Sequence, residues 1–208
     1  LDGDIRKPDS DITQRHKDIA AAAQLVYEDA LFQILRHIYQ ETKCENVVLA
    51  GGCALNSVAN GKILNNTPFS NIWIQPNASD GGTSIGAAAY IYHSILKNRR
   101  SFIQDNAYLG PAYTREEIKS YLDKNKIQYT LFESDDELVR CVAKLIHENQ
   151  VVGWFQERLE WGPRALGARS ILANPCNPNA MSLINEKVKH REKFRPFAPV
   201  VCEEDALN

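Results

Sequence analysis

Residues 46–56 read NVVLAGGCALN, and this stretch decides the fold of the first half of the chain. A short apolar run that ends in two glycines predicts a buried strand turning directly into a helix. Gly51 and Gly52 lack a Cβ, and the free N–H groups of a helix start attract anions, so a nucleotide could approach the backbone here. A tight turn without any ligand accounts for the same residues, and a lone Gly-Gly pair favours that simpler interpretation.

Helical and extended patterns alternate on either side of this stretch. Apolar residues recur at three- and four-residue steps from Asp11 to about Glu41, which predicts a long helix before the strand. After the glycines we expect a short helix over 54–64, a strand over 71–74 and a helix over 83–97. This order of elements is typical of an α/β layer.

A polar and basic stretch at residues 99–107 reads as a linker to a second region. In that region Thr114 and Glu117 form a capping-box pattern, which predicts the start of a helix. The remaining elements that we expect are a strand over 128–132, an amphipathic helix over 135–149 and a strand over 151–155.

A second glycine-rich stretch, residues 79–86, reads SDGGTSIG and opens the helix expected over 83–97. Asp80 precedes Gly81 and Gly82, so its carboxylate can simply cap the helix. A carboxylate at the mouth of a nucleotide site can also bind a metal ion that handles phosphate or carbonyl oxygens. The residues alone leave these two roles evenly balanced.

The stretch 154–173 reads WFQERLEWGPRALGARSILA and places three arginines around a Gly-Pro turn between two expected strands. A guanidinium can grip a phosphate or carboxylate through two parallel hydrogen bonds. This arginine loop, with Arg158, Arg164 and Arg169, therefore predicts an anion site. The alternative is a solvated loop in which the arginines pair with Glu157 and Glu160.

A basic segment follows at residues 187–199, KVKHREKFRPFAP. In an extended conformation its evenly spaced basic side chains would share one face and make an anion-binding strip. These residues are Lys187, Lys189, Arg191, Lys193 and Arg195. A basic surface tail or a nucleic-acid patch is the alternative, which the net charge of −2 disfavours.

Composition narrows the class of protein. The chain has 208 residues, of which 44% are apolar and 24% charged, as in ordinary globular proteins. We expect no nucleic-acid or membrane partner, because there is no excess of positive charge and no apolar run of the ~20 residues that a membrane span needs. Five scattered cysteines without a Cys-x-x-Cys pair favour reduced thiols in a cytoplasmic protein. Because the first residue is Leu1, we expect an internal fragment.

Residues 160–173, EWGPRALGARSILA, and the later FRPFAP at 194–199 resemble a signature of the NodU/CmcH-type O-carbamoyltransferase family. The glycine-rich stretches resemble the second half of an actin-like ATPase fold, and the basic segment is similar to the Lys-x-Arg element of YrdC proteins. The resemblance implies an α/β chain: the end of an actin-like domain over 1–98, a linker over 99–107, and an incomplete YrdC-like domain over 108–208.

The same resemblance implies a reaction in two steps. The YrdC-like domain makes carbamoyl-adenylate from ATP and carbamoyl phosphate. The actin-like domain then moves the carbamoyl group to a hydroxyl of a small-molecule or saccharide acceptor, with a divalent metal, usually iron, while magnesium accompanies ATP. The family's His-x-x-x-His motif, which supplies two metal ligands, does not occur in this sequence and is expected upstream. We therefore expect no carbamoyl transfer by this chain alone.

The resemblance also assigns roles to individual residues. It implies Arg164, Lys189 and Arg191 as catalytic residues and Asp80 as a metal ligand. The residues implied to contact nucleotide or carbamoyl phosphate are Gly51, Gly52, Asn56, Gly81, Gly82, Arg169, Ser170 and Arg195.

Other classes of protein stay open at this point. The chain could be a nucleotide-binding module, an actin-fold kinase-like enzyme without carbamoyl transfer, or an inactive homologue. The arginine loop disfavours the kinase, since an actin-fold kinase has no use for a second anion-binding domain. No motif identifies the acceptor or the oligomeric state.

Overall fold

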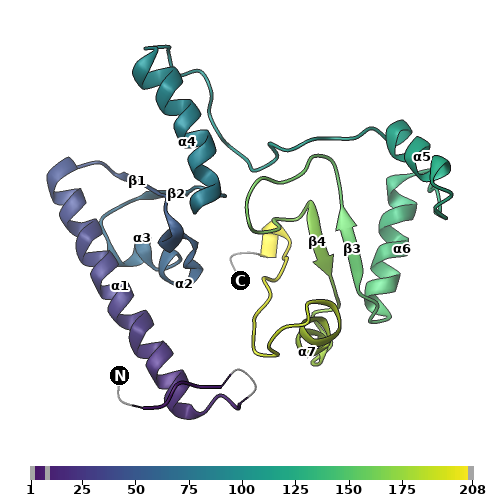
Figure 1. Ribbon diagram of the computed structural model, residues 1–208, viewed down its shortest axis with the longest axis horizontal. Helices are drawn as coiled ribbons and strands as arrows, with labels where there is room; N and C mark the ends of the chain where they lie inside the picture. The colour runs from purple at the N-terminus through teal and green to yellow at the C-terminus, as the bar shows by residue number, and fades with distance from the viewer. Residues whose placement is uncertain (1–2, 8–9, 206–208) are drawn as a thin grey trace. The chain divides into compact units, whose positions relative to one another are not determined.

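The computed structural model describes residues 3–7 and 10–205. The chain divides into two compact units, Leu1–Phe102 and Ile103–Asn208, each with helices and a small sheet (Figure 1). An α/β class is therefore confirmed. The actin-like and YrdC-like assignments stay predictions.

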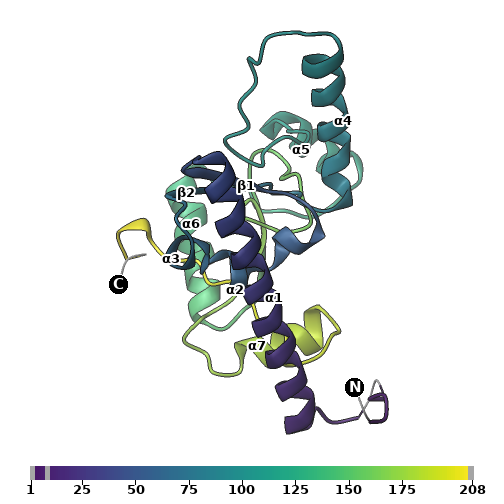
Figure 2. The same ribbon diagram turned by 90° about the vertical axis from the view of Figure 1, so that its left-hand side faces the viewer.

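The first unit is built on a long helix and two parallel strands. Helix α1, Gln14–Thr42, lies against strands β1, Asn46–Leu49, and β2, Asn71–Ile74, in both views (Figures 1 and 2). The strands pair in parallel with Asn46 opposite Asn71. The core joins these elements through Phe32, Leu35, Val47, Ile63 and Phe69.

The small sheet of the first unit is covered on one side only. Val47 is buried in the core, whereas Val48 is 72% exposed and Trp73 is 38% exposed. Among the described residues each strand has a single neighbour, so each also has an unpaired edge.

The expected helix over 54–64 is broken into shorter pieces. A 3-10 turn, Gly52–Leu55, is followed by α2, Ser57–Asn60, and α3, Ile63–Asn66. The break occurs because the side chain of Asn56 caps α2 by accepting a hydrogen bond from the Ala59 N–H at 3.1 Å. After β2 come a 3-10 turn, Asp80–Gly82, helix α4, Thr83–Ala89, and a π-helical turn, Tyr90–Ile95.

The second unit contains an antiparallel strand pair flanked by helices. Helices α5, Arg115–Lys124, and α6, Asp135–His147, precede strands β3, Val152–Phe155, and β4, Arg169–Leu172, and α6 runs beside β3 (Figure 1). The predicted capping box at Thr114 and Glu117 is confirmed. Helix α7, Ala180–Leu183, then continues as a π-helical turn, Ile184–Val188, and a 3-10 turn lies at Glu203–Asp205.

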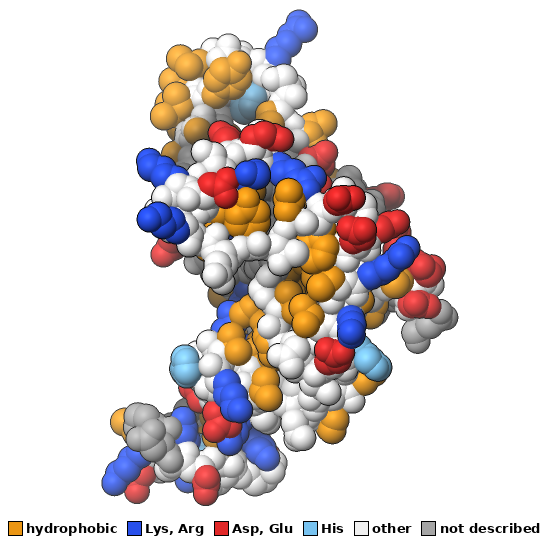
Figure 3. Space-filling model, turned by 90° about the vertical axis from the view of Figure 1, so that its right-hand side faces the viewer, with side chains coloured by type: hydrophobic (Ala, Val, Ile, Leu, Met, Phe, Trp, Pro, Cys, Tyr) orange, Lys and Arg blue, Asp and Glu red, His pale blue; other side chains and the backbone are white. Residues whose placement is uncertain are grey.

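The helical face of the second unit carries apolar side chains at its surface. Figure 3 looks onto the side of α5 and α6 and shows hydrophobic side chains among lysines, arginines and acidic residues. Exposed apolar residues of these two helices include Ile118, Tyr121 and Val139. Among the described helices, none combines the length and apolar character that crossing a bilayer requires.

Two elements predicted for the second unit are wrong. Residues 128–132 form no strand, because no described strand pairs with them; Tyr129 and Leu131 are 40% and 54% exposed. The basic segment is not extended either. It starts in the π-helical turn, Lys189 has helical angles (φ −95°, ψ −15°), and His190 is left-handed at φ 47°. The even spacing of its basic residues therefore does not place them on one face.

Candidate functional site

The two glycine-rich turns of the first unit lie together. Parallel pairing brings the carboxyl ends of β1 and β2 to the same edge, and the Gly51 N–H donates to the Ala78 carbonyl at 2.6 Å. Gly51 has φ 100°, a conformation that side chains rarely adopt, and a Cβ on Gly82 would collide with the carbonyl oxygen of Asn77. Backbone geometry thus requires glycine at both turns with or without a ligand.

Asp80 lies at this edge with an exposed side chain. Its backbone carbonyl accepts the Thr83 hydroxyl at 2.6 Å, but no described residue forms a hydrogen bond or ion pair with its carboxylate. The carboxylate is free to bind a cation and does not cap the helix with its side chain. No group of three His, Cys, Asp or Glu side chains that could hold a metal occurs in the described part of the chain. The role of Asp80 as a metal ligand stays a prediction.

Asn56 is held by its neighbours rather than left open. Besides capping α2, its Nδ2 donates to Gln24 Oε1 at 2.9 Å. Gln24 in turn donates to the buried Glu28, whose carboxylate also accepts from Lys62 Nζ at 2.7 and 2.8 Å. The hydrogen bonds from Gln24 and Lys62 lower the pKa of Glu28. Asn56 therefore belongs to a polar network that fixes the turn after β1.

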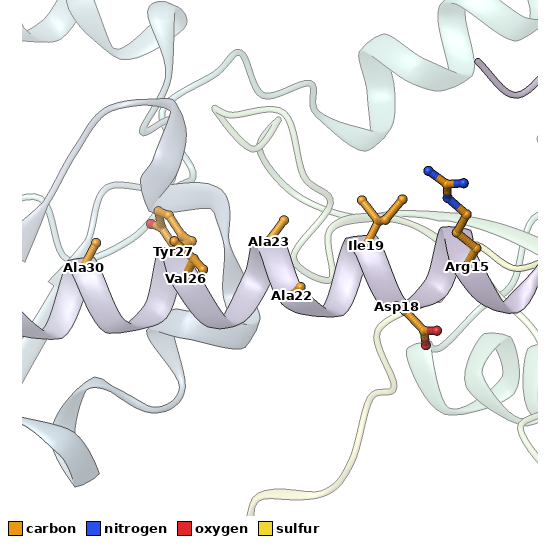
Figure 4. Close-up of a pocket in the computed structure, with 8 residues that line it drawn as sticks. All are labelled: Arg15, Asp18, Ile19, Ala22, Ala23, Val26, Tyr27 and Ala30. Atoms are coloured by element: carbon orange, nitrogen blue, oxygen red, sulfur yellow. The ribbon is translucent and has the colours of Figure 1, made fainter. Parts of the chain in front are cut away.

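A shallow apolar groove runs along α1 next to this region. Figure 4 shows Ile19, Ala23, Tyr27 and Ala30 on one side of the helix, while Asp18 points away from them. The Tyr27 hydroxyl donates to the Cys53 carbonyl at 3.2 Å, and burial raises the pKa of Tyr27. None of the predicted site residues lines this groove.

The arginine loop of the second unit is organised by one buried carboxylate. Glu160 is only 5% exposed, and its Oε1 accepts the backbone N–H groups of Leu166 at 2.9 Å and Ala168 at 3.0 Å. Its Oε2 lies 3.4 Å from Nε of Arg169, as an ion pair. Pairing of an arginine with Glu160 belonged to the alternative interpretation of a solvated loop; the pairing occurs for Arg169, but Glu160 is buried, which its position in the sequence does not indicate.

The three arginines of the loop differ in the hydrogen-bond and ion-pair partners of their side chains. Arg169 pairs with Glu160 and donates to the carbonyls of Gly162 and Arg164, so its interactions are internal. Arg158 donates through Nε to the Gly110 carbonyl at 3.0 Å. The side chain of Arg164 is exposed and has no hydrogen-bond or ion-pair partner among the described residues. Arg158 and Arg164 are both exposed, and Arg164 is the one of the two whose side chain has no partner among the described residues. Ser170, half-buried in β4, pairs opposite Trp154.

The basic segment folds around a single amide. Asn185 is completely buried, and its Nδ2 donates to the carbonyls of Lys193 at 3.1 Å and Arg195 at 2.8 Å. Its Oδ1 accepts from Nε of Arg191 at 2.7 Å. Arg195 forms an ion pair with Glu192 at 2.8 Å, whereas the exposed Lys189 side chain has no partner in the described part of the chain. No pattern in the sequence indicates that this asparagine organises the segment.

Known proteins resemble the chain along most of its length. A family model described as Carbamoyltransferase N-terminus matches residues 4–89, and one described as Carbamoyltransferase C-terminus matches residues 143–208. Thus each of the two units contains one of the matched regions.

Individual relatives agree with these matches. An uncharacterized protein of Synechocystis is 48% identical over 204 residues, which is 96% of this chain and 33% of the relative. Nodulation protein NolNO of Sinorhizobium fredii is 37% identical over 98% of this chain and 30% of its own length. Nodulation protein NolO of Bradyrhizobium diazoefficiens is 37% identical over 97% and 37%, respectively. The chain spans about a third of the length of these relatives, and it belongs to the carbamoyltransferase family of enzymes.

Proposed function

We propose that the chain is part of an ATP-dependent carbamoyltransferase that makes carbamoyl-adenylate and passes its carbamoyl group to a hydroxyl. In balanced form, carbamoyl phosphate reacts with water to give carbamate and phosphate, and carbamate attacks ATP to give carbamoyl-adenylate and pyrophosphate. An acceptor hydroxyl then displaces AMP and becomes an O-carbamate. The acceptor is a small molecule or a saccharide.

The observation that carries this proposal is that the charged side chains of the arginine loop differ in their partners. Glu160 and Arg169 form an ion pair with each other and hydrogen bonds with the loop backbone, whereas the side chain of Arg164 is exposed. A rigid loop that presents a free guanidinium suits a phosphate, because the donor is held in place before the ligand arrives. Arg191 and Lys189 add positive charge from the basic segment of the same unit.

The first unit supplies the proposed transfer site. Gly51 and Gly82 keep side chains away from the edge where β1 and β2 end, and Asp80 presents its carboxylate there. A divalent metal held partly by Asp80 would polarise the carbamoyl carbonyl towards attack by the acceptor hydroxyl.

Pyrophosphate release by the complete open reading frame tests the proposal. Release should require carbamoyl phosphate as well as ATP, and Arg164→Ala should reduce it about ten- to a hundredfold, since a charge-assisted hydrogen bond to phosphate is worth roughly 1.5–3 kcal/mol. Arg140→Ala is the matched control, because Arg140 is an exposed arginine on α6 of the same unit. ATP binding without any carbamoyl phosphate dependence would favour a nucleotide-binding module instead.

A further inference from the structure

The buried amide of Asn185 is unusual within this unit. Ile63 and Asn185 are the largest side chains that the described structure buries completely, and Asn185 alone of the two is polar. Burying an amide is unfavourable unless its donors and acceptor are satisfied. Both Nδ2 donors and Oδ1 have partners here, and every one of those partners lies in the basic segment.

These three hydrogen bonds fix the shape of the segment. The side-chain amide of Asn185 donates to the carbonyls of Lys193 and Arg195, two residues apart, and accepts from Nε of Arg191. The backbone carbonyl of Asn185 also accepts the Arg191 backbone N–H at 2.9 Å. A segment of left-handed and irregular backbone has no ladder of its own to hold it. The side chain of Asn185 takes the place of that ladder.

The same side-chain amide also orients the guanidinium group of Arg191. Its Nε is occupied by Asn185 Oδ1, and its guanidinium carbon lies 4.8 Å from the centre of the Phe197 ring. No described residue forms a hydrogen bond or ion pair with the two terminal nitrogens of Arg191. A guanidinium held at Nε and over one face presents those nitrogens as a fork, the arrangement that binds phosphate through two bonds.

We infer that Asn185 is a positioning residue that orients Arg191 to bind the phosphate of carbamoyl phosphate or ATP. This inference rests on the proposed function for the identity of the ligand. Asn185 itself touches no substrate, and it acts through Arg191.

Kinetics of the complete open reading frame separate this role from general support of the fold. Asn185→Ala should raise KM for a phosphate-bearing substrate about tenfold, the loss of one well-aligned charge-assisted bond, with kcat changed far less. If Asn185 acts through Arg191, the Asn185→Ala/Arg191→Ala double variant should have the same KM as Arg191→Ala alone. Multiplied effects in the double variant would overturn the inference.

As a control, a half-buried amide of the same unit is removed in place of the completely buried one. Asn174 donates to Asn149 Oδ1 at 3.1 Å and makes no hydrogen bond to the basic segment. Asn174→Ala should therefore leave both KM values unchanged. Should Asn185→Ala fail to fold, Asn185→Asp replaces it, because aspartate keeps the acceptor for Arg191 but turns a second oxygen towards the carbonyls of Lys193 and Arg195. It should also raise KM, and an unchanged KM would count against the inference.

A binding arm keeps this test separate from the proposed function. Pyrophosphate binding is measured by calorimetry, and the Arg191 Nε–H signal is followed by NMR in the parent and in Asn185→Asp. We expect weaker pyrophosphate binding, by about tenfold, and a displaced Nε–H signal in the variant. Failure of carbamoyl-adenylate formation by the parent would refute the proposed function alone. Equal pyrophosphate affinity in parent and variant would refute the role of Asn185.

Discussion

Replacing Glu160 with alanine tests how far one carboxylate holds the arginine loop. The change removes the acceptor for two backbone N–H groups, of which that of Ala168 is buried, and the partner of Arg169, whose side chain is 32% exposed. A buried donor without a partner costs about 1–3 kcal/mol, and removing one member of a buried ion pair about 3–5 kcal/mol. These contributions overlap and Arg169 is partly solvated, so we expect a loss of roughly 3–5 kcal/mol.

That loss is a large part of the roughly 5–15 kcal/mol that stabilises a typical domain. Glu160→Gln is the matched control: it keeps an oxygen for the two N–H groups and loses only the charge facing Arg169. We expect it to cost less than Glu160→Ala, because Nε of Arg169 and Oε2 of Glu160 form an ion pair at 3.4 Å without a hydrogen bond.

Urea unfolding in a Trp73→Phe background gives the measurement, because the remaining tryptophans, Trp154 and Trp161, both report on the second unit. Amide exchange supplies a local check, since the Ala168 N–H should exchange roughly a hundredfold faster in Glu160→Ala. A variant that unfolds at the parent's urea concentration with Ala168 still protected would show that the carboxylate does not hold the loop.

Three further predictions concern the first unit. Gly82→Ala should lower the melting temperature measured by calorimetry, because the added Cβ would collide with the Asn77 carbonyl oxygen. Gly86→Ala is the control and should leave the melting temperature unchanged, because the space around Gly86 is open. Equal melting temperatures for the two variants would contradict the close approach at Gly82. Glu28, whose pKa is lowered by Gln24 and Lys62, should stabilise the fold above its ordinary pKa and lose that contribution as pH falls through the lowered value. A plot of the urea unfolding midpoint against pH should be flatter for Glu28→Gln than for the parent. Parallel curves for the two proteins would count against this role of Glu28. Asp80→Ala in the complete open reading frame should abolish carbamoyl transfer but leave pyrophosphate release intact. The melting temperature should not change, because the Asp80 carboxylate has no partner among the described residues. A parallel loss of both activities would refute this separation.

Local chemistry made parts of the fold predictable. The strand before Gly51 and the capping box at Thr114 are patterns in which neighbouring residues satisfy each other's geometry, and both occur. The prediction that this strand is buried is wrong for one of its faces, where Val48 is exposed. Residues 128–132 have the apolar composition of a strand, but a strand also needs a partner, and a sequence pattern does not say whether one is available.

The candidate site was harder to predict than the fold around it. Evenly spaced basic residues predicted an extended strip, and the outcome instead depends on Asn185, a neutral residue outside the spacing pattern. Likewise, Glu160 and Arg169 were recognisable as opposite charges, yet the burial of Glu160 decides that Arg169 is paired and that Arg164 has no partner among the described residues. Burial is a property of the assembled unit, and a linear pattern holds little information about it.

The uncovered face of the β1–β2 pair has a practical consequence for every measurement on this chain. Parallel strands are normally shielded on both faces, but here Val48 and Trp73 lie at the surface and each strand has an unpaired edge among the described residues. Exposed apolar edges of this kind promote pairing between molecules. Protein concentration is therefore an experimental variable, and sedimentation or light scattering across a dilution series belongs before any folding or binding curve is interpreted as that of a monomer.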